Sequence, residues 1–160
     1  MPMVPFHTRL NDLAFAETRT VLVPDRPGLP AGTYAFLELY CDEPDCDCRR
    51  VIIRVVSHGT VPKVWATINY GWESTEYYRT WIPSAEDARQ FTGAWLDPLN
   101  PQTEHAPALL ELFRWVLTDE SYVARLKRHY DLFKKAVRSE GSASRRRRAP
   151  RSRTRKRRRH

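Results

Sequence analysis

Residues 50–57 read Arg-Val-Ile-Ile-Arg-Val-Val-Ser, and five of these eight residues are Val or Ile. β-Branched side chains pack well on a pleated sheet and lose rotamer freedom in a helix, so this stretch predicts a strand. Short, turn-rich connections to the neighbouring segments predict antiparallel pairing in a meander of about four strands. The other predicted strands are 13–23 (LAFAETRTVLV), 33–40 (TYAFLELY) and 61–70 (VPKVWATINY), after an irregular lead-in over 1–12 and with turns at 24–30 and 58–60.

The second half of the chain has helical periodicity. Apolar residues from Tyr122 to Val137 recur at steps of four, four, three and four, which is typical of an amphipathic helix. We expect this helix to follow an N-cap at Thr118 and to end at Gly141. Strands followed by about three helices predict an α+β fold with the helices packed on one face of the sheet. The two earlier helices are predicted over 84–95, beginning at an N-cap Ser84, and over 104–117.

The formal net charge of +8, from 27 Lys and Arg against 19 Asp and Glu, is distributed unevenly. Residues 145–160 hold eleven basic side chains and no acidic one, which leaves a net charge of about −3 for residues 1–144. This asymmetry disfavours a uniformly basic class such as a histone-like or ribosomal protein. We expect a single globular domain over 1–140 and a disordered Arg-rich tail over 141–160, because the tail has no large apolar residue and repels itself.

The basic tail is a candidate segment for binding nucleic acid or another polyanion. Guanidinium groups match phosphate oxygens in pairs, so such a tail binds with little sequence preference and with strong salt dependence. The alternative is an extension that has no selected ligand. The candidate nucleic-acid-binding residues are Arg145, Arg146, Arg147, Arg148, Arg151, Arg153, Arg155, Lys156, Arg157, Arg158 and Arg159.

The sequence contains no run of roughly 18 apolar residues, and its first residues lack the basic and apolar regions of a secretory signal. We therefore expect a cytoplasmic protein without a membrane partner.

The most informative stretch reads Cys41-Asp-Glu-Pro-Asp-Cys46-Asp-Cys48. In a reducing compartment, clustered cysteines more often bind a metal than form a disulfide. Thiolates are soft ligands that suit zinc, and Pro44 helps the chain to turn back toward Cys41. The sequence therefore predicts a structural zinc site at Cys41, Cys46 and Cys48. Reduced thiols without a metal, or a disulfide or redox role, are the alternatives.

Structural zinc takes four ligands, so the three cysteines need a partner. We predict His7, because a hairpin that turns near 26–29 returns the lead-in to the cysteine end of the sheet. His58 is disfavoured, since a strand over 50–57 spans about 26 Å and carries it to the far end. The remaining candidates are a water, the loop carboxylates Asp42, Asp45 and Asp47, and the histidines His105 and His129.

Two other groups of side chains have alternative interpretations. Five aromatic residues lie between Tyr70 and Trp81, and aromatic rings beside a basic groove can stack nucleic-acid bases. We favour packing at the corner between sheet and helices, because Arg79 is the one cation in that window. The basic residues of the last helix form either a solvated face or a continuation of the tail; they are Arg125, Lys127, Arg128, Lys134, Lys135 and Arg138.

The segment from Glu38 to Val51, with Ile68–Glu73 and Arg125–Tyr130, resembles a group of hypothetical bacterial proteins that share an Asp-Cys-Asp-Cys-Arg-Arg-Val core. The resemblance covers most of residues 1–140 and stops before the tail. It implies a bacterial, cytoplasmic setting. It transfers no catalytic residue, because the group has no established activity.

Three functions are compatible with these features. The favoured one is a small cytoplasmic zinc-binding module with a basic tail that binds nucleic acid or another polyanion. The first alternative is a metal-dependent hydrolase in which the cysteines hold the ion and Asp45, Asp47 or Glu73 transfers protons. The second is a metal-free protein-interaction adaptor with an exposed aromatic patch. A non-enzymatic module is favoured, because the sequence shows no recognised nucleophile–base arrangement and thiolate-rich shells are typical of structural zinc.

Overall fold

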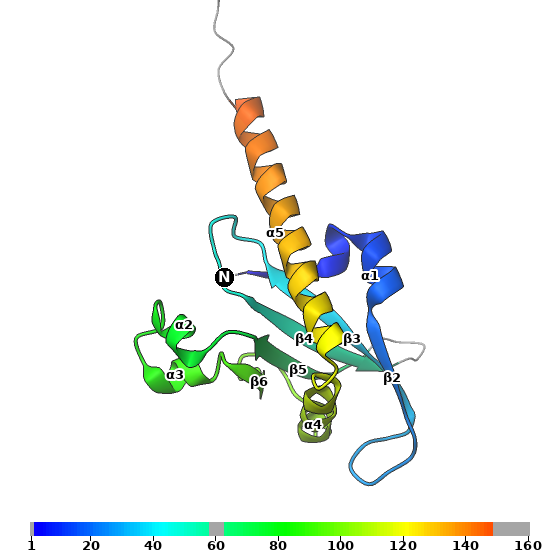
Figure 1. Ribbon diagram of the computed structural model, residues 1–160. Helices are drawn as coiled ribbons and strands as arrows, with labels where there is room; N and C mark the ends of the chain where they lie inside the picture. The colour runs from blue at the N-terminus through cyan, green and yellow to red at the C-terminus, as the bar shows by residue number, and fades with distance from the viewer. Residues whose placement is uncertain (1, 58–62, 149–160) are drawn as a thin grey trace, which may run out of the picture.

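The computed structural model describes residues 2–57 and 63–148, which form a six-stranded antiparallel sheet with helices packed around it (Figure 1). The strands lie in the order β1-β3-β4-β5-β6, and β2 pairs with the first half of β3. Phe36 of β3 lies opposite Val55 of β4, and Arg50 at the start of β4 lies opposite Gly71 at the end of β5. The strands are β1 Met3–Pro5, β2 Arg19–Val23, β3 Gly32–Cys41, β4 Arg50–Ser57, β5 Val64–Gly71 and β6 Gly93–Leu96.

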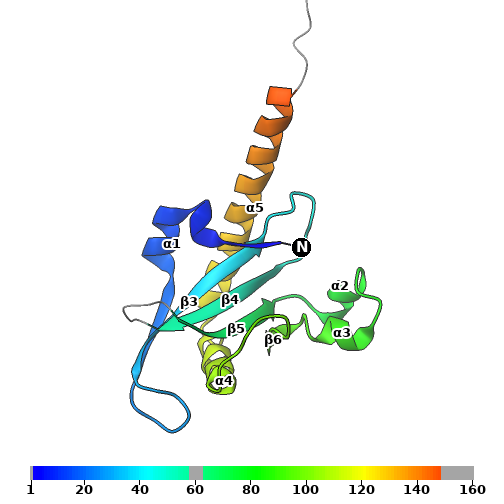
Figure 2. The same cartoon turned by 180° about the vertical axis from the view of Figure 1, so that it is seen from behind.

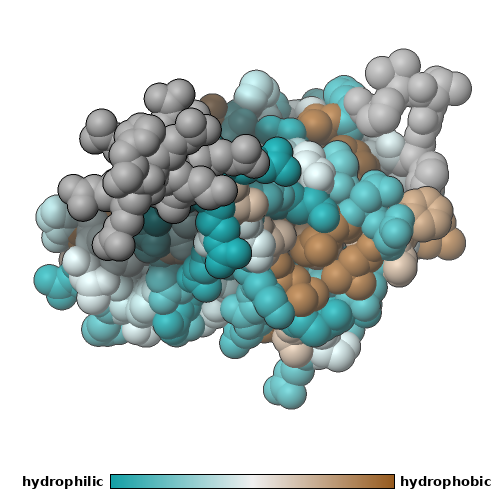
Figure 3. Space-filling model, turned by 90° about the horizontal axis from the view of Figure 1, so that it is seen from above, coloured by the Kyte–Doolittle hydropathy of each residue, from teal (hydrophilic) through white to brown (hydrophobic). Residues whose placement is uncertain are grey.

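Helices α4 and α5 cover one face of the sheet and enclose the core, so that in the opposite view the strands lie in front of α5 (Figure 2). Phe113 of α4 packs against Phe36 with ring centroids 5.4 Å apart, and buried Tyr40 donates to the Leu126 carbonyl of α5 at 3.0 Å. Seen from above, most of the visible surface is polar and apolar residues gather in one area (Figure 3). The helical segments are η1 Phe6–Thr8, α1 Asn11–Glu17, α2 Thr75–Arg79, α3 Ala85–Arg89, α4 Ala106–Val116 and α5 Glu120–Arg148.

The α+β class and the antiparallel sheet are confirmed, and the strands predicted over 33–40 and 50–57 are β3 and β4. The predicted number of about four strands is too low, because the sequence pattern does not reveal the short strands β1 and β6. The turn predicted at 58–60 lies outside the described residues. So does the start of the strand predicted over 61–70, which the structure shows from Val64 onward.

The strand predicted over 13–23 is wrong in its first half. Residues 11–17 form α1, and β2 begins at Arg19. Leu, Ala and Glu in the first half are good helix formers, whereas the β-branched residues of the second half lie in β2. The lead-in over 1–12 is also not irregular, since it contains β1 and η1.

The helix predicted over 84–95 is wrong beyond its first turn. The predicted N-cap is correct, because the Ser84 hydroxyl accepts from the backbone N–H of Asp87 at 3.3 Å, but α3 ends at Arg89. Gly93 then adopts a φ of 77°, a left-handed conformation that interrupts a helix, and β6 follows directly. The spacing of four residues between Phe91 and Trp95 is therefore not helical.

Helix α5 is longer than predicted. It continues through Gly141 to Arg148, so the predicted helix end and the predicted start of disorder at 141 are both wrong. Its N-terminus is capped by Asp119 and not by Thr118, since the Asp119 carboxylate accepts from the Ser121 backbone N–H at 3.0 Å. Residues 149–160, which include the tail residues from Arg151 to Arg159, lie outside the described residues.

Candidate metal centre

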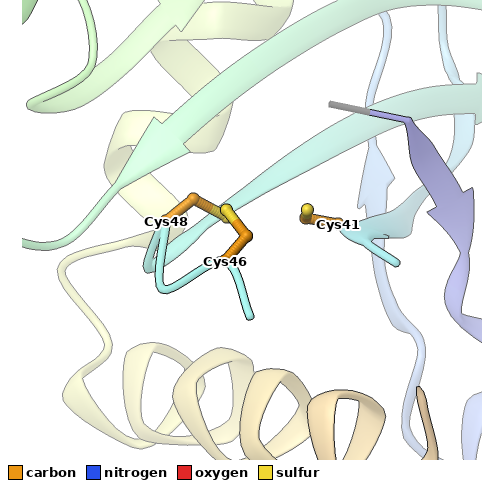
Figure 4. Close-up of side chains that lie close together, drawn as sticks. All are labelled: Cys41, Cys46 and Cys48. Atoms are coloured by element: carbon orange, nitrogen blue, oxygen red, sulfur yellow. The ribbon is translucent and has the colours of Figure 1, made fainter. Parts of the chain in front are cut away.

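Three cysteine sulfurs meet at the end of the sheet. Cys41 is the last residue of β3, and Cys46 and Cys48 belong to the loop that leads to β4, where their side chains lie together facing Cys41 (Figure 4). The three sulfurs all lie within 4.8 Å of one another, and none of these cysteines forms a disulfide. Zinc–sulfur bonds of about 2.3 Å require sulfurs about 3.8 Å apart in a tetrahedron, so one ion fits this group after a small adjustment.

The site has a buried side and an accessible side. Cys41 and Cys48 are buried, whereas Cys46 is half-buried and lines a surface hollow of about 510 Å³ together with Tyr77 and Trp81. A metal ion or a further ligand therefore has a route to the sulfurs past Cys46.

Helix α5 holds the cysteine loop from one side. The ammonium group of Lys134 donates to the carbonyl oxygen of Cys41 at 3.4 Å and to that of Glu43, and Arg138 donates to that of Pro44 at 3.1 Å. Much of the basic face of this helix is therefore used internally. Arg125 and Arg128 likewise bind Glu17 of α1, which weakens the interpretation of the face as a continuation of the tail's binding surface.

Helix α2 holds the same loop from another side. The Tyr77 hydroxyl donates to the carbonyl oxygen of Asp47, and the Tyr78 hydroxyl donates to that of Arg49 at 2.8 Å. Tyr78 is buried and packs edge-on against Trp81, with ring centroids 5.7 Å apart. Tyr78 thus packs in the corner, as we favoured from the sequence, whereas Trp81 is 39 % exposed. Tyr77 and Tyr78 also position the backbone between Cys46 and β4.

Arg49 connects the loop to its surroundings by a strained backbone and a set of ion pairs. Its φ of 44° is unusual for a residue other than glycine. Its guanidinium pairs with Asp47 at 2.9 Å and with Glu73 at 3.2 Å, and its backbone N–H donates to the Tyr130 hydroxyl at 3.3 Å. The hydrogen bond from Arg49 lowers the pKa of Asp47, so this carboxylate stays ionised and paired.

The three thiols are electrostatically unequal. A hydrogen bond from Cys48, aided by the nearby charge of Lys134, lowers the pKa of Cys41 to about 6 despite its burial. The same hydrogen bond, together with burial, raises the pKa of Cys48, and burial raises that of Cys46. Cys41 is therefore the thiol that ionises first.

Among the described residues, no histidine joins the group of the three cysteine sulfurs. The lead-in does return to the cysteine end, with Met3 opposite Cys41, but the chain then turns into η1, where His7 is exposed beside a small cavity lined by Phe15. Among the described residues the group of ligand atoms close enough to share an ion contains the three cysteine sulfurs and does not include His7. His7 stays a prediction.

The other proposed ligands have different surroundings. His105 contacts the Gly28 carbonyl at 3.0 Å, and His129 lies between Glu17 and Glu38. Asp42 and Asp45 belong to the cysteine loop but not to the sulfur group, within the part of the chain that the structure describes. His58 lies outside that part.

Lys134 is the main site residue that the sequence analysis missed. Its side chain is 2 % exposed, although lysine is one of the residues least often buried. The signal was present in the spacing, since residue 134 continues the apolar series of Leu126 and Tyr130 at a step of four. A lysine on the apolar stripe of a helix indicates a buried acceptor, here the carbonyl oxygens of the cysteine loop.

In the described part of the chain no helix is both long enough and apolar enough to span a membrane. Comparison of the chain with models of known protein families, with curated proteins and with solved structures finds no match.

Proposed function

We propose that this protein is a small module whose end of the sheet is stabilised by one structural zinc ion bound to Cys41, Cys46 and Cys48. The observation that carries the proposal is the approach of the three sulfurs to within 4.8 Å of one another in a loop held by two helices. Soft thiolate ligands favour zinc over calcium or magnesium. Three thiolates and Zn²⁺ sum to one negative charge, and the adjacent ammonium of Lys134 balances it.

A structural role is favoured over hydrolysis by the state of the neighbouring carboxylates. Of the three proton carriers that the hydrolase alternative names, Asp47 and Glu73 are both paired with Arg49, whereas Asp45 is exposed. A general base works best with a pKa near the working pH, whereas the pKa of Asp47 is lowered. The fourth zinc ligand is proposed to approach on the half-buried side, at Cys46.

The test is metal analysis of the purified full-length chain. We expect about one zinc per chain, and cobalt substitution should produce the visible absorption of thiolate-bound Co²⁺. Cys46→Ser should lose the metal and unfold at lower temperature, whereas Asp12→Asn, at an exposed position on α1, should retain it. His7→Ala tests the fourth ligand predicted from the sequence.

Other results would overturn the proposal in distinct ways. A metal-free chain that is fully folded would remove zinc from the account and favour the adaptor alternative. A Cys46→Ser chain that stays folded but loses a hydrolytic activity would favour the enzyme.

We propose, second, that the basic tail binds nucleic acid or a similar polyanion. Supporting this, α5 projects away from the sheet, and its far end carries the exposed side chains of Arg145, Arg146 and Arg147 (Figure 1). Neutralising phosphates releases counterions, so the logarithm of the affinity should fall with the logarithm of salt at about −0.9 per contact on duplex DNA.

The test compares the full chain with one that ends at Ser144, using a duplex DNA of unrelated sequence. The shorter chain should bind much more weakly and with a shallower salt dependence, while zinc content and melting temperature stay unchanged. Equal binding by the two chains would exclude the tail as the binding element.

A further inference from the structure

A hollow of about 510 Å³ lies over the sheet strands β4 and β5, and its lining residues include neither the three cysteines nor the tail. Its floor includes Ile52, Thr67 and Asn69, which are residues of the face opposite to the buried residues Val51 and Ile53. The segment after α3 forms its wall. Volumes of this size are typical of sites for small molecules.

The guanidinium of Arg50 is held in place within this hollow. Its Nη1 donates to the Asn69 side-chain oxygen at 2.7 Å, and its Cζ lies 4.7 Å from the ring centroid of Phe91. Its Nε is buried and has no partner among the described residues. The protein therefore orients this cation but satisfies it incompletely, which is unusual for a buried donor.

Arg54 provides a second cation on the same face, because residues four apart in a strand point to the same side. It lies opposite Thr67 of β5 and is half-buried. Within residues 2–57 and 63–148, it has no hydrogen-bond or ion-pair partner. Two arginines on one strand, with Ile52 between them, thus face a hollow in which the described residues pair the first partly and give the second no polar partner.

The walls of the hollow offer apolar and flat surface. Trp95 is 45 % exposed and Leu99 is 90 % exposed, so both present large apolar side chains to solvent at its edge. Phe91 adds an aromatic ring on which Arg50 already lies. A ligand that is anionic at one end and planar or apolar elsewhere would match both the arginines and the apolar walls.

Two acidic residues also line the hollow, and they act differently. The carboxylate of Asp97 accepts from the Leu99 backbone N–H at 2.8 Å and from the Asn100 amide at 2.9 Å, so it is committed to its own turn. Asp87 is exposed near the start of α3. The charges of both carboxylates oppose an anion, and that of Asp87 lies at the exposed rim.

We infer that this hollow is a binding site for a small organic oxyanion with a flat apolar body, either a carboxylate or a phosphate monoester, bound by Arg50 and Arg54. The guanidinium groups would donate paired hydrogen bonds to the oxyanion, and the apolar body would lie against Trp95 and Leu99. The inference does not depend on zinc or on the tail.

The experiment titrates the purified full-length chain with 1-naphthyl phosphate and, separately, with 1-naphthoate, while backbone amide signals are followed by NMR. Neutral 1-naphthol and inorganic phosphate are the comparison probes. We expect saturable chemical-shift changes of the β4 and β5 amides for the naphthyl anions. The relative affinity of the two anions identifies phosphate or carboxylate as the preferred group.

Three variants make the result decisive. Arg54→Gln, which removes no hydrogen bond or ion pair among the described residues and should fold normally, should weaken binding at least about tenfold. Asp87→Asn should strengthen it, because a repulsive charge is removed, and Arg79→Gln, an exposed arginine on α2 outside the hollow, should leave it unchanged. Shifts confined to the tail, equal binding of 1-naphthol, or binding unaffected by Arg54→Gln would overturn the inference.

Discussion

The ammonium group of Lys134 lies 3.4 Å from the carbonyl oxygen of Cys41 and also donates to that of Glu43, in a position where the side chain is 2 % exposed. Helix α5 is thereby joined to the first residues of the loop that leads from β3 to Cys46. Burying the ammonium group costs desolvation free energy, which its hydrogen bonds to the loop offset. When the lysine is removed, the carbonyl oxygens lose their donor.

Lys134→Met should therefore destabilise the cysteine loop. The substitution keeps the apolar stem but removes this donor from the buried carbonyl oxygen of Cys41 and from the part-buried one of Glu43, which costs about 1–3 kcal/mol of unfolding free energy. Urea denaturation and zinc affinity measure the effect. Lys127→Met, at an exposed position on the same helix, is the control, and equal losses in the two variants would contradict the role of Lys134.

His129 forms a pH-dependent contact between α5, α1 and β3. Its Nδ1 lies 2.7 Å from Glu38 Oε2 and its Nε2 lies 2.7 Å from Glu17 Oε2. Burial alone lowers the pKa of His129, but the hydrogen bonds and charges of Glu38 and Glu17 outweigh it, so the pKa is raised above 6.5. The hydrogen bond from His129, with a second from Arg128, lowers the pKa of Glu17 below 4.5.

The signs of these shifts define a window of greatest stability for this contact. The His129 contribution is fully present below pH 6.5 and is lost as the pH rises through the raised pKa, whereas the Glu17 contribution is present above pH 4.5 and is lost as the pH falls through the lowered pKa. Unfolding free energies measured across pH should show both losses in the natural chain. In His129→Gln the loss of unfolding free energy on the alkaline side should disappear. A pH profile parallel to that of the natural chain would show that His129 does not cause this loss.

Gly71→Ala should be strongly destabilising, because an added Cβ would overlap the carbonyl oxygen of Phe91 and the ring and hydroxyl of Tyr78. The Phe91 carbonyl belongs to the backbone and the Tyr78 side chain is buried, so neither can move aside easily. We therefore expect a loss of about 3 kcal/mol or more of unfolding free energy. The melting temperature measures this loss. The effect should extend to the metal centre, since Tyr78 holds the backbone beside Cys48; unchanged zinc affinity in a folded variant would argue against that link.

Gly141→Ala should have the opposite effect. Gly141 lies inside α5, has open space around its Cα and does not have a positive φ, so alanine should stabilise the helix by about 0.5–1 kcal/mol and raise helical circular dichroism. If the helix instead ended at Gly141 in a left-handed cap, as the sequence pattern predicts, alanine would lower both quantities.

The sequence by itself determined the elements that local chemistry specifies strongly. The β-branched run of 50–57 became β4 without a change of bounds, and the apolar steps from Tyr122 to Val137 became the buried stripe of α5. The spacing of Cys41, Cys46 and Cys48 likewise predicted a group of sulfurs that the fold brings together. In each case the signal lies within one helix, one strand or one loop.

Tertiary structure decided what depends on distant neighbours. Trp95 has helical spacing from Phe91, yet it joins the sheet because β5 offers an unpaired edge and Gly93 turns the chain toward it. Lys134 is buried because the cysteine loop presents carbonyl oxygens to α5 across more than ninety residues of chain. Arg50 and Arg54 share a hollow because the segment after α3 lies beside β5. Such contacts are absent from local sequence patterns, since the free energy that stabilises them comes from groups that meet when the whole sheet is formed.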